Sequence, residues 1–361
     1  MLTQVQSGML QTTAQYYGFK NRIINGAMVI DQRNAGASIT PTTTGANTYT
    51  LDRWSFQPSQ ASKVSIQQNA GSVTPPVGFK NYLGATVLSA VTVGAGDYFV
   101  LGQGIEGYNI ADLGWGTANA KTVTLSFWVY SSLTGSFGGS LTNASGTRSY
   151  PYLYSVPVAN TWTQISITIP GETTGTWITN NGGGIYLYFS LGMGSTYSGT
   201  AGAWVSANYD SATGAVSVVG TSGATFYITG VQLEVGTQAT SFDYRPYTTE
   251  LQLCQRYYWR ATGPNDSPIG SGLSISTTAA SVYVKLPVTM RIVPAVNAIS
   301  MVITDAANYN ASITSVSLVV GGTDAVRLNV ACSGGGMTQY RPALMDQLGS
   351  GASYTEFNSE L

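Results

Sequence analysis

Strict alternation of apolar and polar residues is the feature that most constrains the fold of this chain. In residues 121–130, valine, leucine and phenylalanine alternate with threonine, serine, tryptophan and tyrosine, and the same period of two recurs in 161–169 and 184–190. This period places successive side chains on opposite faces of a half-buried strand. Loops rich in Gly and Asn, such as 180–184, separate these segments. The pattern predicts a chain built mainly of short β-strands.

One helix is expected, over residues 248–260. Thr248 or Thr249 can cap its first turn, and Glu250 lies near the positive end of its dipole. Further short strands are expected after it, over 281–286, 295–304, 311–320 and 325–330. We therefore expect a second, smaller β-rich domain over residues 248–361.

Composition excludes several kinds of partner. Charged residues make up only 9% of the chain and the net charge is −1, whereas binding to nucleic acid needs clustered Lys and Arg. We therefore expect no nucleic acid partner. The sequence has no run of 18 apolar residues, so membrane insertion is not expected either. A surface rich in Ser, Thr, Asn and Gln is typical of extracellular β-structure.

The residues available for chemistry are few. Histidine is absent, which excludes Ser-His-Asp and Cys-His mechanisms and His-ligated zinc. Cys254 and Cys332 are expected to be small buried hydrophobic residues rather than a disulfide. The 16 acidic residues are scattered singly, so the carboxylate pair of a glycosidase would have to come from the fold. We expect no enzyme activity and no cofactor, although loop oxygens leave a structural calcium ion open.

Residues 102–107 contain three glycines in a known sequence pattern. Gly102, Gly104 and Gly107 spell G-x-G-x-x-G, which in nucleotide-binding proteins opens a helix. No helix is expected here, so we interpret the segment as a loop of the sandwich.

Aromatic residues are the strongest candidates for a binding site, since the chain has 23 Tyr and 7 Trp. Trp128 and Tyr130 on one strand, and Tyr186 and Tyr188 on another, lie opposite the aliphatic positions and are expected to form a flat platform. Sugar rings stack on such surfaces because their C–H faces are apolar. The alternative is that these rings pack against a neighbouring subunit or the other sheet. Candidate glycan contacts on loops are Trp115, Trp177 and Trp204.

Several motifs carry a resemblance to a known fold. Residues 227–235, YITGVQLEV, resemble the closing strand of carbohydrate-binding-type jelly rolls. The SFWV segment at 126–129 and the W-x-x-I-x-I-x-I-P segment at 162–170 resemble earlier strands of the same fold. The resemblance implies a jelly-roll β-sandwich over 21–247.

A second resemblance concerns bacteriophage and prophage fibre proteins. Residues 21–33 resemble their opening "N-x-x-x-NG-x-x-x-x-x-QR", and 49–54 resemble the "Y-x-x-DRW" that follows, with the ring of Trp54 expected to be buried. Residues 242–247, FDYRPY, resemble a recurrent junction in these fibres. Residues 290–296 resemble the "MR-x-x-P-x-V" segment of fibre tip domains.

The resemblance implies a phage virion protein, either a tail fibre or a fibre-like appendage such as a head fibre. It also implies a homotrimer that attaches to host cell-surface polysaccharide. Residues 1–20 would then join the fibre to other virion proteins or to copies of itself, unless they are a frayed terminus. A capsid or tail decoration protein and a polysaccharide depolymerase are the alternatives. Host, glycan and position on the particle are not given by the sequence.

Overall fold

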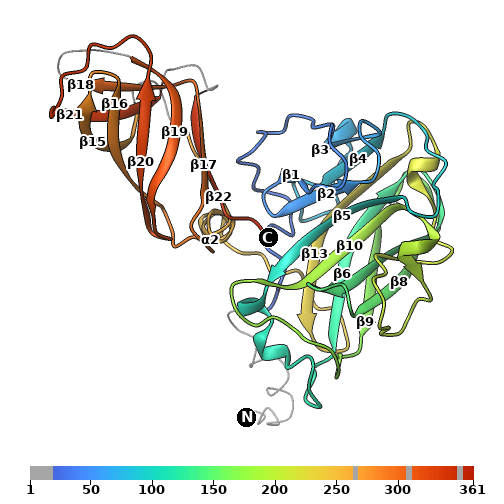
Figure 1. The fold of residues 1–361 in the computed structure, drawn as a ribbon. Helices are drawn as coiled ribbons and strands as arrows, with labels where there is room; N and C mark the ends of the chain where they lie inside the picture. Colours follow the sequence, from blue (N-terminus) through green and yellow to red (C-terminus); the bar gives the residue numbers. More distant parts are fainter. Residues whose placement is uncertain (1–18, 263–266, 306–310, 348–352) are drawn as a thin grey trace, which may run out of the picture. The chain divides into compact units, whose positions relative to one another are not determined.

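The computed structural model describes residues 19–262, 267–305, 311–347 and 353–361, so the expectation for the first 20 residues lies almost wholly outside it. The chain divides into two compact units, with the boundary between Arg245 and Pro246 (Figure 1). Within the described residues, α2 (Tyr247–Gln255) is the one α-helix, and strands dominate both units. The expected all-β class is confirmed.

The first unit is a sandwich of two antiparallel sheets. The first sheet, in spatial order, consists of β1 (Thr48–Leu51), β2 (Trp54–Pro58), β5 (Tyr98–Glu106), β10 (Gly183–Met193), β7 (Gly135–Asn143) and β8 (Ser149–Val156). The second sheet, in spatial order, consists of β3 (Val64–Gln68), β4 (Leu83–Val87), β13 (Thr225–Val235), β6 (Val123–Ser131) and β9 (Thr163–Ile169). Neighbouring strands within each sheet run antiparallel, which agrees with the expected jelly-roll sandwich.

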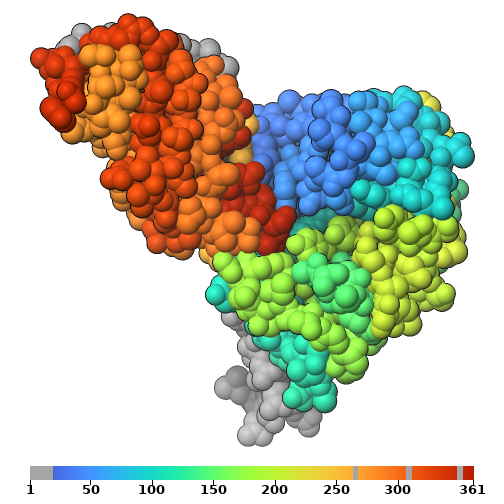
Figure 2. Space-filling view, in the orientation of Figure 1, coloured from blue at the N-terminus to red at the C-terminus, as the bar shows by residue number. Residues whose placement is uncertain are grey.

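Short elements complete the sandwich. They are η2 (Ala70–Ser72), η3 (Gly107–Asn109), η4 (Ala111–Leu113), η5 (Ser195–Tyr197), η6 (Val218–Gly220) and the parallel pair β11 (Ser198–Gly199) and β12 (Ser211–Ala212). Figure 2 shows residues near 200 as a yellow-green area on the surface of the sandwich.

The alternation of the sequence explains the core between the two sheets. The buried hydrophobic side chains of β6 belong to one face of the strand: Val123, Leu125, Phe127 and Val129. Trp128 and Tyr130 point to the opposite, outer face and are partly exposed. Gly102 and Gly104 lie inside β5, so the interpretation of this segment as a loop was wrong.

The second unit has its own hydrophobic core. A three-stranded sheet consists, in spatial order, of β14 (Tyr258–Ala261), β22 (Tyr354–Asn358) and β17 (Ala295–Ile299). A closed barrel consists, in order, of β15 (Pro268–Ser276), β16 (Ala279–Lys285), β20 (Ala325–Cys332), β19 (Ala311–Gly321), β18 (Met301–Asp305) and β21 (Pro342–Gln347).

The helix expected over 248–260 is shorter than predicted. It starts at Tyr247, with Pro246 at the N-cap position and no capping side chain, so neither threonine caps it. Tyr258 is buried at the start of β14, which pairs with β22, because the aromatic residues that follow the helix pack into the core of the second unit. Tertiary packing therefore converts the last predicted turn into a strand.

Cys254 and Cys332 are buried and form no disulfide, as predicted. No helix among the described residues has the length and apolar character needed to cross a bilayer. The strand expected over 295–304 is interrupted at Ser300, whose positive φ of 52° separates β17 from β18.

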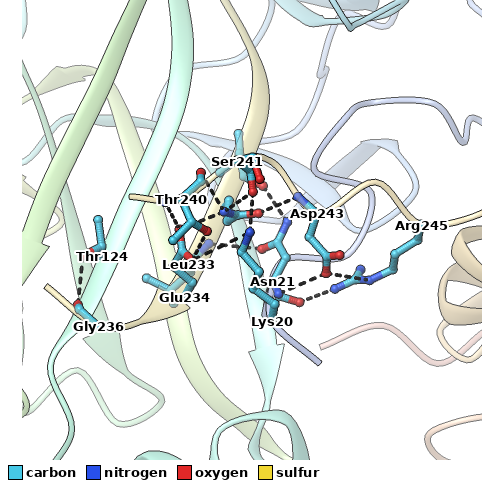
Figure 3. A network of polar contacts seen from close by, with 12 residues as sticks. Lys20, Asn21, Thr124, Leu233, Glu234, Gly236, Thr240, Ser241, Asp243 and Arg245 are labelled. Carbon is cyan, nitrogen blue, oxygen red and sulfur yellow. Dashed lines mark hydrogen bonds and ion pairs between the residues drawn. The ribbon is translucent and has the colours of Figure 1, made fainter. Parts of the chain in front are cut away.

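The link after β13 folds back onto the first residues of the sandwich (Figure 3). The Asn21 side chain donates to the carbonyl of Val231 at 3.1 Å and accepts from the amide of Leu233 at 3.1 Å. Arg245 donates to the carbonyls of Ile23, at 3.1 Å, and of Asn21. The two ends of the sandwich sequence are therefore joined by hydrogen bonds to main-chain groups.

The glutamine and glutamate of the VQLE segment are buried in the same network. Gln232 accepts from the amide of Asp243 at 2.8 Å and donates to Oε1 of Glu234 at 2.8 Å. Glu234 also accepts from the amide and the hydroxyl of Thr240, at 2.8 and 2.6 Å. These motif residues are thus explained by structure rather than by ligand binding.

Candidate functional site

The four strand aromatics proposed as one platform lie on two different sheets. Trp128 and Tyr130 belong to β6 in the second sheet, whereas Tyr186 and Tyr188 belong to β10 in the first. Both pairs face away from the shared core, so they lie on opposite outer faces of the sandwich. The single four-residue platform is therefore not formed, because alternation predicts the face of a strand but not its sheet.

Tyr186 and Tyr188 are stacked, with ring centroids 6.2 Å apart and an interplanar angle of 19°. Across the sheet they lie directly opposite Gly104 and Gly102 of β5. A Cβ atom added to Gly102 would lie 2.7 Å from Cδ1 of Tyr188. Glycine at this position therefore leaves the space that allows the tyrosine ring to lie across the neighbouring strand.

The pairing register adds a third tyrosine to this surface. Tyr49 of β1 pairs with Ser55, Ser55 pairs with Gly102, and Gly102 pairs with Tyr188. These residues form one row across the outer face of the first sheet. The guanidinium of Arg33 lies 4.9 Å from the ring centroid of Tyr49.

Asp210 supplies a carboxyl group beside these rings. Burial raises the pKa of Tyr188, and the charges of Asp210, Tyr186 and Tyr49 raise it further. The surface formed by Tyr49, Tyr186, Tyr188, Arg33 and Asp210 is called the tyrosine face below. Burial also raises the pKa of Asp210 to about 6, so this carboxyl changes its charge near neutral pH.

Asp210 is the last residue of the loop that joins β11 to β12. Its amide donates to the carbonyl of Tyr197 at 2.9 Å. The next residue, Ser211, packs against β7, because a Cβ atom on Gly138 would lie 2.7 Å from its hydroxyl. The hydroxyls of Ser190 and Ser211 are buried without a hydrogen-bond partner among the described residues. Polar groups thus accompany the tyrosines on this side of the first sheet.

We expect the Asp210→Asn variant to be more stable than the wild type at pH 8 by on the order of 2–3 kcal/mol, and equally stable near pH 3.5. The folded carboxyl binds its proton up to about pH 6, whereas the unfolded one releases it near pH 4. The unfolding free energy of the wild type therefore decreases as the pH rises from about 4 to about 6. Urea unfolding at both pH values measures the difference.

Asp97 gives a control of opposite sign. Hydrogen bonds from the backbone amide of Gly94, the hydroxyl of Ser59 and the side-chain amide of Gln60 hold the pKa of Asp97 below its usual value. Its stabilising effect is present at neutral pH and is lost as pH falls through that lowered pKa. Asp97→Asn should therefore lower the unfolding free energy at pH 7. In strong acid the variant and the wild type should be equally stable. If Asp210→Asn and Asp97→Asn changed the unfolding free energy equally at pH 7, the raised pKa of Asp210 would be contradicted.

The three loop tryptophans come together at one end of the sandwich. Trp115, Trp177 and Trp204 lie with ring centroids 4.8–5.5 Å apart in edge-on contacts, and Tyr150 contacts Trp204 at 5.3 Å. Their indole N–H groups donate to backbone carbonyls at 2.8–3.0 Å. Trp115 and Trp177 are only 6% and 8% exposed, and Trp204 is partly exposed. This arrangement fastens the loops to one another and leaves mainly Trp204 accessible to a ligand.

The sequence interpretation missed Tyr49, Arg33 and Asp210. The alternating glycines Gly102 and Gly104 in an apolar segment were a usable signal, since glycine inside a strand marks the close approach of another group. No local signal identifies Asp210, because its position depends on the path of a long loop. Among the described residues, no group of three or more acidic or cysteine side chains is arranged to hold a metal ion.

Comparison with known proteins gives a limited result. No protein-family model and no curated protein matches the chain. It is similar to the enzymatically active domain of tailspike protein 4 of bacteriophage CBA120, with TM-score 0.31, 12% identity and coverage of 51% of this chain and 20% of that one. The carbohydrate-binding module TmCBM61 in complex with β-1,4-galactotriose matches with TM-score 0.29, 11% identity and coverage of 54% and 99%.

A family 11 carbohydrate-binding module from Clostridium thermocellum, in complex with a mixed-linked tetrasaccharide, matches with TM-score 0.27, 12% identity and coverage of 57% and 100%. The match spans one fifth of the length of the tailspike chain. At these scores the similarities do not decide a function, which has to be argued from the residues of the site.

Proposed function

We propose that the sandwich binds polysaccharide on the tyrosine face. The observation that carries this proposal is the pair of stacked, partly exposed rings of Tyr186 and Tyr188, which lie across Gly102 and Gly104. Sugar rings stack on such surfaces through their C–H faces. Asp210 and Arg33 provide the hydrogen-bond acceptor and donor that orient sugar hydroxyls beside the rings.

Binding without hydrolysis is the better match to this chemistry. A glycosidase needs two carboxyl groups separated by roughly 5–10 Å, each of which feels the charge of the other. The raised pKa of Asp210 has burial as its cause rather than a neighbouring carboxylate. We therefore propose no catalytic role. Release of reducing ends from a bound polysaccharide, abolished by Asp210→Asn, would favour the depolymerase instead.

We extend the proposal to a bacteriophage fibre or fibre-like appendage in the virion, with host cell-surface polysaccharide as its ligand. The support is the resemblance of residues 21–33, 49–54 and 242–247 to fibre proteins. A homotrimer would present three copies of each site, and such multivalency multiplies weak binding by roughly 10²–10⁴-fold. Detection of the chain in purified virions tests this assignment, and its absence from them would refute it.

Replacing Tyr188 by alanine should weaken binding of a polysaccharide ligand on the order of tenfold, because one stacking surface is lost. Tyr186→Ala should have a similar effect. The measurement is affinity electrophoresis of the full chain in gels that contain neutral or acidic polysaccharides.

Tyr108→Ala provides the matched control, because Tyr108 is 61% exposed and lies outside the tyrosine face. It should bind like the wild type. If both tyrosine variants retain wild-type affinity for a retarding polysaccharide, the tyrosine face is not the site. If no polysaccharide retards the wild type, a purely structural decoration protein becomes the better assignment.

A further inference from the structure

The outer face of the second sheet carries another group of aromatic rings, which the proposed function does not use. Tyr130 of β6 is stacked on Tyr227 of β13, at 5.4 Å and 7°, and Trp162 lies 5.4 Å from Tyr130. Tyr82 contacts Tyr227 at 5.1 Å and Trp162 at 5.6 Å. Tyr82 and Tyr227 are buried, whereas Tyr130 and Trp162 are partly exposed. Buried rings thus support exposed ones.

These rings are held in place by polar contacts. The indole N–H of Trp162 donates to the carbonyl of Thr74 at 2.8 Å, and the hydroxyl of Tyr82 accepts from the amide of Val73 at 2.8 Å. Gly84 leaves space for Tyr227, since a Cβ atom there would lie 2.8 Å from the ring. Side chains that are already fixed lose little conformational entropy when a ligand binds.

The exposed side chains beside these rings on β9 are uncharged and polar. Trp128, also partly exposed, lies on the same face of β6 and pairs across the sheet with Gln164 of β9. The next outward side chains of β9, Ser166 and Thr168, are exposed hydroxyl groups, whereas Thr124 and Ser126 of β6 are buried. The tyrosine face, in contrast, includes the charged residues Asp210 and Arg33. Rings surrounded by hydroxyl and amide groups, without charge, match a neutral sugar rather than an acidic one.

We propose that Trp128, Tyr130, Trp162 and Gln164 form a second carbohydrate-binding site, selective for neutral glycans. This inference rests on the proposed function of the sandwich but on different residues. The two sites lie on opposite outer faces, with two packed sheets between them, so one short oligosaccharide cannot contact both. One sandwich would therefore bridge two polysaccharide chains.

The indole N–H signals of the full chain, labelled with ¹⁵N-tryptophan, report on this site by NMR. The chain has seven tryptophans, and the signals of Trp128 and Trp162 are assigned with Trp128→Phe and Trp162→Phe. The probes are neutral oligosaccharides of glucose, galactose, mannose and xylose. At least one should shift both signals while the signal of Trp259, in the second unit, stays in place.

The same shifts should persist in the Tyr186→Ala/Tyr188→Ala double variant, which separates the two sites. If neutral oligosaccharides bind the wild type but none of them shifts the signals of Trp128 and Trp162, the second site is overturned and the proposed function stands. The absence of any neutral ligand would also overturn it, whereas retardation by acidic polysaccharides would still support the tyrosine face. Loss of the shifts in the double variant would mean that only one site exists.

A variant of the site itself completes the test. Gln164 lies at an exposed position of β9. Gln164→Ala should lower the affinity for the neutral oligosaccharide, measured from the NMR shifts, at least a fewfold without altering folding. A mixture of a neutral polysaccharide and a polysaccharide that the tyrosine face binds should be cross-linked and become turbid with the wild type, and stay clear with either the Tyr186→Ala/Tyr188→Ala variant or Trp128→Ala. Turbidity that survives Trp128→Ala would contradict bridging through this site.

Discussion

Replacing Trp54 by alanine should destabilise the sandwich by about 4–5 kcal/mol, the upper end of the range for a buried aromatic residue. Trp54 is fully buried, packs against Phe189 with ring centroids 6.4 Å apart, and donates from its indole nitrogen to the carbonyl of Asn25 at 3.0 Å. The variant therefore loses apolar packing and leaves a buried carbonyl with one donor fewer.

Urea unfolding of the full chain, followed by the fluorescence of the remaining tryptophans, measures this loss. All of them except Trp259 lie in the first unit, so the signal reports on the sandwich. Trp54→Phe keeps much of the packing and should cost roughly 1–2 kcal/mol. Tyr108→Ala, at an exposed position, should cost less than about 0.5 kcal/mol. If Trp54→Ala had the same urea unfolding transition as Tyr108→Ala, the stabilising role of Trp54 would be disproved.

Asn21→Ala should destabilise the sandwich by about 3–5 kcal/mol, a large effect for one small polar side chain. Besides its bonds to Val231 and Leu233, the Asn21 side chain accepts from the amide of Ile23 at 3.0 Å. The variant leaves two buried amides and one buried carbonyl without this partner, and each loss costs about 1–3 kcal/mol. Urea unfolding measured as above gives the difference.

Asn119→Ala is the matched control, since Asn119 lies in an exposed turn. It should change the unfolding free energy by less than about 0.5 kcal/mol. Asn21→Asp supplies a graded comparison, because it keeps an acceptor but removes the donor to Val231. An Asn21→Ala variant as stable as the control would mean that the side-chain hydrogen bonds of Asn21 in Figure 3 add nothing to stability.

The strands and the buried motif residues were largely predictable. The segments predicted over 161–169, 184–190 and 325–330 correspond closely to β9, β10 and β20, because alternation is a local property that a half-buried strand imposes. The buried ring of Trp54 was also predicted correctly. The end of the helix was not, since the burial of Tyr258 depends on β22, which lies about a hundred residues later.

The binding surface was only partly predictable. The sequence correctly placed Tyr186 and Tyr188 on the face opposite the aliphatic core, but joined them to Trp128 and Tyr130 on another sheet. The burial of Trp115 and Trp177 had no local signal, because it arises from contacts between loops that are far apart in the sequence.

The sequence alone therefore determined the strands that alternate clearly, such as β6, β9 and β10, which side of each of them faces the core, and that histidine-based chemistry is excluded. Each of these depends on composition or on neighbours within a few residues. Only the tertiary structure decided that Tyr49, Tyr188 and Asp210 share one surface and that Trp128 lies on the opposite one. The reason is physical: strand pairing and loop packing are contacts between distant segments, and a local pattern of side chains does not specify its partner.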